Sequence, residues 1–317
     1  MHVDPALRAF AGDAVQIAAA QVRVVSAKEE WASSDRVAPI LADCETLARD
    51  GAMDCRSALG ALMAGEGAQA FVDGWVCAMT RAWRNAPLAQ IPFRHSYSSG
   101  SGAMHLHRAG GVTLALLIVE PNAAMPPRTI AFTDCDRWEL VIAGNGRGRA
   151  YDWSGAGPPE VTNLVLQPGL RLACDRSRSR AIVSLDTPLV ILRVSCERPC
   201  PRATSEVEIA TGRVVHRASA CPAEGRAQLS AALLGAMGRA DAAPVLADYA
   251  CGQADGGARW EALRHALALD TAAGFAGLSR LAEDPGDELA PAARALRVSL
   301  CTTYPQLANL CEAPCRA

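Results

Sequence analysis

Hydrophobic and polar residues alternate most clearly in the middle of the chain, over residues 137–143. Glu139 and Val141 fall on one side of this stretch, and on the other side lie Trp138, Leu140 and Ile142. A period of two residues is typical of a β-strand. The segment 144–146, Gly-Asn-Gly, follows. Because glycine readily takes the positive φ angles of a tight turn, we expect the next strand, 147–151, to fold straight back.

Short apolar runs of similar length flank this strand on both sides, and Gly or Pro turns separate them. They occupy residues 111–121, 163–166, 170–173, 180–185 and 189–195. Six or more short strands at this spacing are typical of a β-sandwich or a small β-barrel.

Both ends of the chain have a helical pattern. Before residue 88 the clearest stripe recurs at i, i+3, i+4, i+7 and i+11 and comprises Val72, Trp75, Val76, Met79 and Trp83. Beyond residue 222 helical stripes return, the first of them formed by Leu229, Leu233, Leu234 and Met237. We therefore expect an α+β fold, in which a central β-barrel lies between α-helical regions and Trp75 and Trp83 pack against that barrel.

Several residues of the central region match a known pattern. Glu139 and Gly146 have the spacing of the last two positions in the motif G-x5-H-x-H-x3/4-E-x6-G, and Pro168-Gly169 precedes the strand that ends at the Thr187-Pro188 turn. On these residues the segment from Gly111 to Cys196 resembles the cupin superfamily, whose fold is a double-stranded β-helix or jelly roll. The later helices are similar to HEAT-type pairs. We expect a helical bundle over 1–88, a cupin-like β-barrel over 89–220 and a helical, HEAT-like domain over 221–317.

The metal ligands implied by the cupin resemblance are largely missing. The two histidines of the first motif would fall within residues 132–135, where the chain has Phe-Thr-Asp-Cys, and Arg180 occupies the place of the later histidine. A lone Glu139 does not hold a catalytic divalent ion. We expect a metal-less protein with no cofactor.

Arg180 is the first candidate for ligand binding. In the cupin-like register its guanidinium points into the barrel mouth, where a buried cation needs a partner. That partner is either a carboxylate of the protein, Glu139 or Asp136, or an anionic ligand. Arg149 and Tyr151 on a neighbouring strand complete the candidate ligand-binding set.

Two other groups of residues have the chemistry of metal ligands. His105 and His107 are two residues apart, so on a regular strand they share a face, and His95 could pair across a hairpin; three imidazoles can hold zinc or iron. The second group combines three cysteines with one histidine, namely Cys196, Cys200, His216 and Cys221. Its spacing is not that of a standard zinc finger, and the intervening residues have the pattern of a Gly-turned hairpin.

The composition excludes several classes of partner. The net charge of −2 gives no electrostatic reason to bind nucleic acid or an anionic membrane, and no helix has the basic face of a helix-turn-helix reader. No run approaches the roughly 20 apolar residues of a membrane helix. The first residues lack the pattern of a signal peptide, so we expect a cytoplasmic protein. Most of the 12 cysteines lie among apolar neighbours and are expected to be small buried hydrophobic residues.

Two classes of function remain open. The first is a non-catalytic ligand-binding or regulatory protein that takes a small anionic ligand, contacts a protein partner through its helical domains and forms a homodimer. The second is a cupin enzyme, either a metal-dependent oxygenase using His95, His105 and His107 or a metal-free isomerase-like enzyme. The latter needs a His or Tyr paired with a carboxylate, and the core strands offer only Tyr151 with Asp152. No P-loop, nucleophile elbow or dinucleotide fingerprint occurs, and the lack of a clear base favours the first class.

Overall fold

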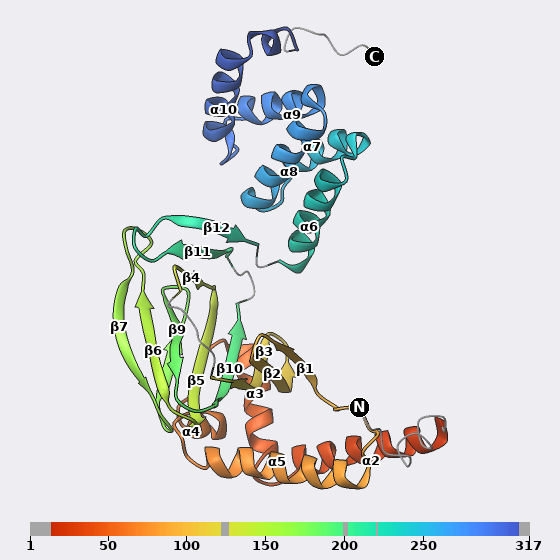
Figure 1. Ribbon diagram of the computed structural model, residues 1–317, viewed down its shortest axis with the longest axis vertical. Helices are drawn as coiled ribbons and strands as arrows, with labels where there is room; N and C mark the ends of the chain where they lie inside the picture. Colours follow the sequence, from red (N-terminus) through yellow and green to blue (C-terminus); the bar gives the residue numbers. More distant parts are fainter. Residues whose placement is uncertain (1–13, 122–126, 199–201, 220, 311–317) are drawn as a thin grey trace. The chain divides into compact units, whose positions relative to one another are not determined.

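The computed structural model describes residues 14–121, 127–198, 202–219 and 221–310, and over these residues the fold is α+β, with nine α-helices and three antiparallel sheets. The chain divides into two compact units (Figure 1). The first unit comprises the residues up to Pro201 and Glu206–Val214, and the second comprises Arg202–Ser205 and Val215–Ala317. The three-domain boundaries expected from the sequence stay a prediction.

Two facing sheets form most of the β part of the first unit. The larger has six strands in the order β1 (Arg94–Ser98), β2 (Ser101–Ala109), β3 (Val112–Val119), β10 (Leu189–Glu197), β5 (Cys135–Ala143) and β8 (Arg171–Cys174). The smaller has the order β7 (Glu160–Leu166), β6 (Gly146–Asp152) and β9 (Arg178–Leu185). A third sheet has the order β12 (Val214–Ala218), β11 (Thr204–Glu208) and β4 (Thr129–Phe132).

The central β-barrel expected from the sequence is not confirmed: the strands of the described residues hydrogen-bond into three separate sheets, and no closed barrel is found among them. The turn at residues 144–146 accounts for part of the difference. It does not make a hairpin: β5 pairs with β10 and β8, whereas β6 pairs with β7 and β9. Gly144 has a φ of 95°, and a Cβ there would lie 2.2 Å from the carbonyl oxygen of Pro188. The backbone N–H of Asn145 donates to the Thr187 hydroxyl at 2.9 Å. The turn therefore carries the chain from one sheet to the other.

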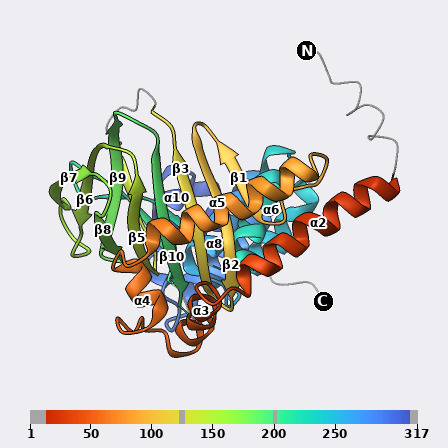
Figure 2. The same cartoon turned by 90° about the horizontal axis from the view of Figure 1, so that it is seen from below.

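Four helices cover one face of the six-stranded sheet (Figure 2). They are α2 (Ala14–Ala32), α3 (Ala38–Asp50), α4 (Ala58–Met63) and α5 (Ala68–Asn85). The stripe expected on α5 is largely confirmed, since Val72, Trp75 and Met79 are buried and Trp83 is partly buried against the cores of the unit. Val76 is the exception, with an exposed side chain.

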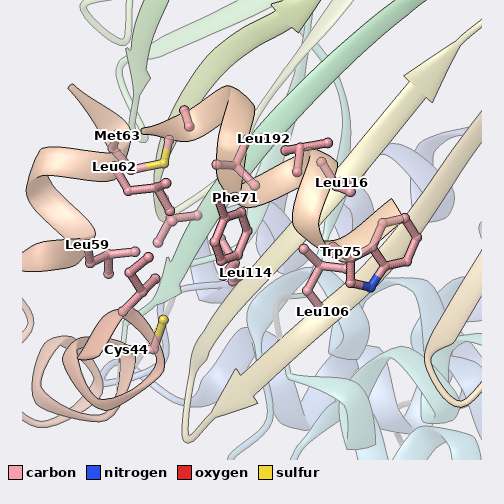
Figure 3. Close-up of a cluster of buried hydrophobic side chains, with 14 of the residues drawn as sticks. Cys44, Leu59, Leu62, Met63, Phe71, Trp75, Leu106, Leu114, Leu116 and Leu192 are labelled. Carbon is pink, nitrogen blue, oxygen red and sulfur yellow. The ribbon is translucent and has the colours of Figure 1, made fainter. Parts of the chain in front are cut away.

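Both faces of the six-stranded sheet carry apolar side chains that pack against other elements, which explains the continuous hydrophobic runs of β3 and β10. Its helix-covered face carries Leu114, Leu116 and Leu192, which pack against residues such as Phe71 and Leu62 (Figure 3). Its other face, which we call the inner face, packs against the β7–β6–β9 sheet. The apolar part of this inner core includes Val141, Leu166, Ile182, Leu189 and Ile191.

The second unit contains five helices among its described residues. They are α6 (Pro222–Ala236), α7 (Ala243–Ala250), α8 (Gly256–Leu269), α9 (Thr271–Glu283) and α10 (Ala290–Thr303). Asp255 and Asp270 cap α8 and α9 by accepting backbone N–H bonds. The buried Arg259 donates to the Ala250 carbonyl at 2.8 Å and pairs with Asp287. The similarity to HEAT-type pairs stays a prediction. No described helix is both long and apolar enough to cross a bilayer.

Candidate functional site

The inner face holds a buried carboxylate between two guanidinium groups. Glu139 lies on β5, Arg193 is its directly paired neighbour on β10, and Arg180 reaches it from β9 of the opposite sheet. Arg193 Nε donates to Glu139 Oε1 at 2.7 Å, while Arg180 Nε donates to Glu139 Oε2. Both carboxylate oxygens are therefore engaged. The expected pairing of Arg180 with Glu139 is present, and the inward direction of Arg180 agrees with its alternation with Ile182.

The electrostatics of this cluster keep Glu139 ionised. Burial by itself raises the pKa of Glu139, but Arg180 and Arg193 outweigh it through charge and hydrogen bonds, so the pKa lies below its usual value. Burial also lowers the pKa of Arg193, which Glu139 counteracts, while the like charges of Arg180 and Arg137 lower it further. The cluster thus combines one anion with repelling cations.

Arg137 adds a third guanidinium to the same face. It is two residues before Glu139 on β5 and pairs with Cys174 on β8 and Ser195 on β10. Its Nε and Nη2 atoms are buried, and within the described part of the chain neither has a hydrogen-bond partner. Buried polar groups are normally satisfied, so these two donors call for an acceptor.

Two buried free thiols flank Arg137 on this face. Cys174 lies opposite it across the β5–β8 pair, and Cys135 is two residues before it. Burial raises the pKa of both thiols, and the positive charge of Arg137 only partly opposes this. At neutral pH they are uncharged and supply no counterion for the guanidinium groups.

The other expected ligand-binding residues lie elsewhere. Ala150 of β6 pairs with Arg180 and shares its face, so Arg149 and Tyr151, one residue away on either side, point to the opposite face of that sheet. Tyr151 is buried among Ile130, Phe132 and Val207. The structure does not bring Arg149 and Tyr151 to Arg180. Asp136, the alternative partner of Arg180, lies one residue from the inner-face position and pairs with Arg198 at 3.0 Å.

The three histidines of the metal hypothesis do not converge. A β-bulge between His105 and His107 breaks the two-residue period: His105 pairs with Ala115 and His107 with the adjacent Leu114. Adjacent residues point to opposite faces, so the expectation that both histidines share a face is wrong. His95 pairs with Met104 and its Nδ1 lies 2.9 Å from the Phe93 carbonyl. Among the described residues no three His, Cys, Asp or Glu side chains are grouped to hold a metal ion.

The second metal hypothesis is only partly covered by the structure. Cys200 lies outside the described residues. Cys196 is a buried residue of β10, on the helix-covered face of the large sheet, and His216 is exposed on β12. Cys221 is exposed just before α6.

Sequence reasoning missed Arg137 and Arg193 as members of the inner-face cluster. For Arg137 a signal was available, because a residue two positions before Glu139 on a strand shares its face. For Arg193 the signal was the polar residue inside the apolar run 189–194, which only a polar partner on the inner face explains. We call Glu139, Arg137, Arg180 and Arg193 the inner-face cluster.

The first unit thus carries this cluster between two facing antiparallel sheets, and helices cover the other face of the larger sheet. No family model and no curated protein matches the chain. Solved structures that are similar to it include a sugar phosphate isomerase of the cupin superfamily from Silicibacter pomeroyi, with 12% identity, a TM-score of 0.27, and coverage of 41% of this chain and 89% of that one. The Drosophila melanogaster CENP-C cupin domain has 13% identity, a TM-score of 0.28 and coverage of 33% and 76%. Oxalate decarboxylase from Bacillus subtilis has 14% identity, a TM-score of 0.27 and coverage of 33% and 27%. Likenesses this distant transfer no activity.

Proposed function

We propose that the first unit is a binding module for a small anion, a carboxylate or a phosphate, held at the inner-face cluster by Arg137 with Arg180 and Arg193. The observation that supports this most directly is the pair of buried, unpartnered nitrogens of Arg137 within the described residues. Nε and Nη2 of one guanidinium form a fork that accepts two oxygens of a carboxylate or phosphate side by side.

The charge of the cluster favours an anion as well. The cluster contains three guanidinium groups and only one carboxylate, Glu139, and the two thiols beside Arg137 are neutral. Excess positive charge in a partly dry interior is costly, and a bound anion removes that cost because attraction is stronger where the dielectric is low. The side chains of Arg180 and Arg193 are 11% and 24% exposed, so part of the cluster is in contact with solvent.

Binding fits the cluster better than acid–base chemistry. Glu139 has both oxygens engaged and a lowered pKa, so it is a weak base. Its role is to hold Arg180 and Arg193 in position. The enzyme alternatives stay predictions, and the binding proposal needs neither a metal nor a cofactor.

Thermal unfolding in the presence of inorganic phosphate, sulfate or malonate tests the proposal, with chloride at equal ionic strength as the reference. An anion at 100 times its Kd stabilises the folded state by about 2.7 kcal/mol, which raises the Tm by several degrees. We expect that rise in the wild type and in Arg149→Gln, a matched control on the opposite face of β6. We expect none in Arg137→Gln.

The stability of Arg137→Gln without ligand is part of the same test. Removing an unpartnered cation that repels Arg180 and Arg193 should not lower the free energy of unfolding in chloride buffer. Equal anion-dependent shifts in the wild type and in Arg137→Gln would rule out the inner-face cluster as the anion site.

A further inference from the structure

The inner face of the six-stranded sheet continues as a polar strip from the inner-face cluster to the edge strand β1. Residues that pair directly on neighbouring strands share a face of the sheet. Arg193 of β10 pairs with Ala115 of β3, which pairs with His105 of β2. His105 in turn pairs with Arg94 of β1. Arg94 and His105 therefore lie in the same row of the inner face as Arg193.

A second row of paired residues runs beside the first. Arg137 of β5 pairs with Ser195 of β10, which pairs with Thr113 of β3. Thr113 pairs with Arg108 of β2. Each row thus joins an arginine of the inner-face cluster to an exposed arginine near the sheet edge. We call the residues beyond the cluster the inner-face track; they are Arg94, His105, Arg108, Thr113 and Ser195.

The positive charges of the track have no counterion in the part of the chain that the structure describes. Arg94 and Arg108 are exposed, and neither forms an ion pair or a side-chain hydrogen bond there. Burial lowers the pKa of His105, and the positive charges of Arg94 and Arg108 lower it further, so the three side chains lie close together. Glu197 also faces this side, beyond Ser195 at the end of β10, but no ion pair joins it to either arginine.

From these rows we infer that the anion site extends along the inner-face track and that its ligand is a linear polyanion, with phosphate or carboxylate groups repeated along a chain. The inference rests on the proposed function, because Arg137 and Arg193 of the cluster form the inner ends of the rows. Neighbouring strands are about 4.8 Å apart, so three strand spacings separate Arg108 from Arg137 by about 14 Å. The same spacing separates Arg94 from Arg193. A single compact anion does not span this distance, whereas a chain contacts both ends.

The remaining features of the track suit such a chain. Thr113 and Ser195 are half-buried between the two arginines of their row, and their hydroxyl groups can donate to anionic oxygens. Trp, Tyr and Phe are absent from the track, so it offers no platform on which nucleic acid bases stack. β1 and β2 lie at the side of the large sheet away from the β7–β6–β9 sheet (Figure 2). The track therefore favours a flexible small polyanion over a nucleic acid.

Isothermal titration of the full chain at constant ionic strength tests the inference, with orthophosphate, a short linear polyphosphate and cyclic trimetaphosphate as probes. The wild type should bind linear polyphosphate about tenfold more tightly than orthophosphate, because additional arginines contact the chain. Cyclic trimetaphosphate carries several charges but cannot extend, so it should show no such gain. A short polyglutamate peptide forms a second series, and the series that shows the gain identifies the source of the anionic groups.

Substitutions in the track separate this inference from the proposed function. Arg108→Gln and Arg94→Gln should each lower the affinity for the linear polyanion about tenfold and leave orthophosphate binding unchanged. Arg149→Gln, on the opposite face of β6, is the matched control and should bind every probe like the wild type. If both track variants bind both chains as the wild type does while orthophosphate still binds, the extended site is wrong and the proposed function stands. No binding of any probe by the wild type would overturn both.

Discussion

At the scale of single residues, Glu139 connects the two facing sheets. It is a buried carboxylate of the large sheet that accepts hydrogen bonds from Arg193 in the same sheet and from Arg180 in the opposite one. Replacing one member of a buried ion cluster is costly mainly because the remaining charges lose their partner. The effect of a substitution thus depends on how many charges it leaves unpaired.

We predict that Glu139→Leu lowers the free energy of unfolding by about 3–5 kcal/mol, since it leaves the cations of the inner-face cluster without a counterion. Arg180→Met should cost less, because Arg193 still pairs with the carboxylate. Urea unfolding of both variants measures which of them loses more free energy of unfolding. If Arg180→Met is the more damaging change, Arg193 does not compensate for its loss and the assignment of roles in the cluster is wrong.

At the scale of secondary-structure elements, the bulge in β2 decides where its histidines lie. His107 is placed beside Leu114, and Glu45 and Lys28 of the covering helices are the charges that act on it. Burial lowers its pKa, Lys28 lowers it further, and Glu45 opposes the change. His107 Nε2 is a buried nitrogen with no partner in the part of the chain that the structure describes. His107 is therefore held neutral.

The lowered pKa of His107 predicts a stability that depends on pH. In the unfolded chain a histidine takes up its proton below about pH 6.5, whereas His107 in the folded state does so only at lower pH. This contribution to stability is therefore fully present above about pH 6.5, the pKa in the unfolded chain, and is lost as the pH falls below it. Urea unfolding between about pH 5 and 7.5 should show a smaller fall for His107→Gln than for the wild type.

His105 provides the comparison for this series. Burial lowers the pKa of His105 as well, and the positive charges of Arg94 and Arg108 lower it further. His105→Gln should therefore also reduce the loss of stability at low pH, and the double variant should reduce it most. A wild-type stability that does not change over this range would mean that neither histidine is held neutral by the fold.

Local patterns predicted the elements better than their pairing. Alternation placed Glu139 and Arg180 on faces that meet, because strand pairing is regular around both residues and the register shifts of β5 and β9 lie further along each strand. The same reasoning failed for His105 and His107, because a β-bulge depends on how the strand pairs with its neighbour. The alternation of residues along β2 itself does not reveal it. The turn at Gly144 was recognisable, but its packing against Pro188, which turns a hairpin into a crossing between sheets, depends on residues more than 40 positions away.

At the scale of the whole molecule, the helices before residue 88 and the six-stranded sheet of the first unit share one hydrophobic core. The rings of Trp31 and Trp75 lie beside that of Phe93, with centroid distances of 6.4 and 5.7 Å. Trp31 also contacts Phe71, at a centroid distance of 5.5 Å. Leu114 and Leu192 of the sheet belong to the same core. The sheet thus depends on these helices to cover its apolar face.

We predict that deleting residues 1–88 leaves a chain that is insoluble or unfolds without cooperativity, because the deletion exposes the face with Leu114, Leu116 and Leu192. Solubility and the sharpness of thermal unfolding measure the effect. A soluble remainder with an unchanged Tm would contradict the shared core.

The most direct measurement of the central claim is isothermal titration of the metal-free full chain with inorganic phosphate and with malonate. We predict saturable heat with a stoichiometry of one anion per chain for at least one of them. That heat should be lost in Arg137→Gln and retained in Arg149→Gln. No saturable binding in the wild type, or the same binding in Arg137→Gln, would contradict an anion site at the inner-face cluster.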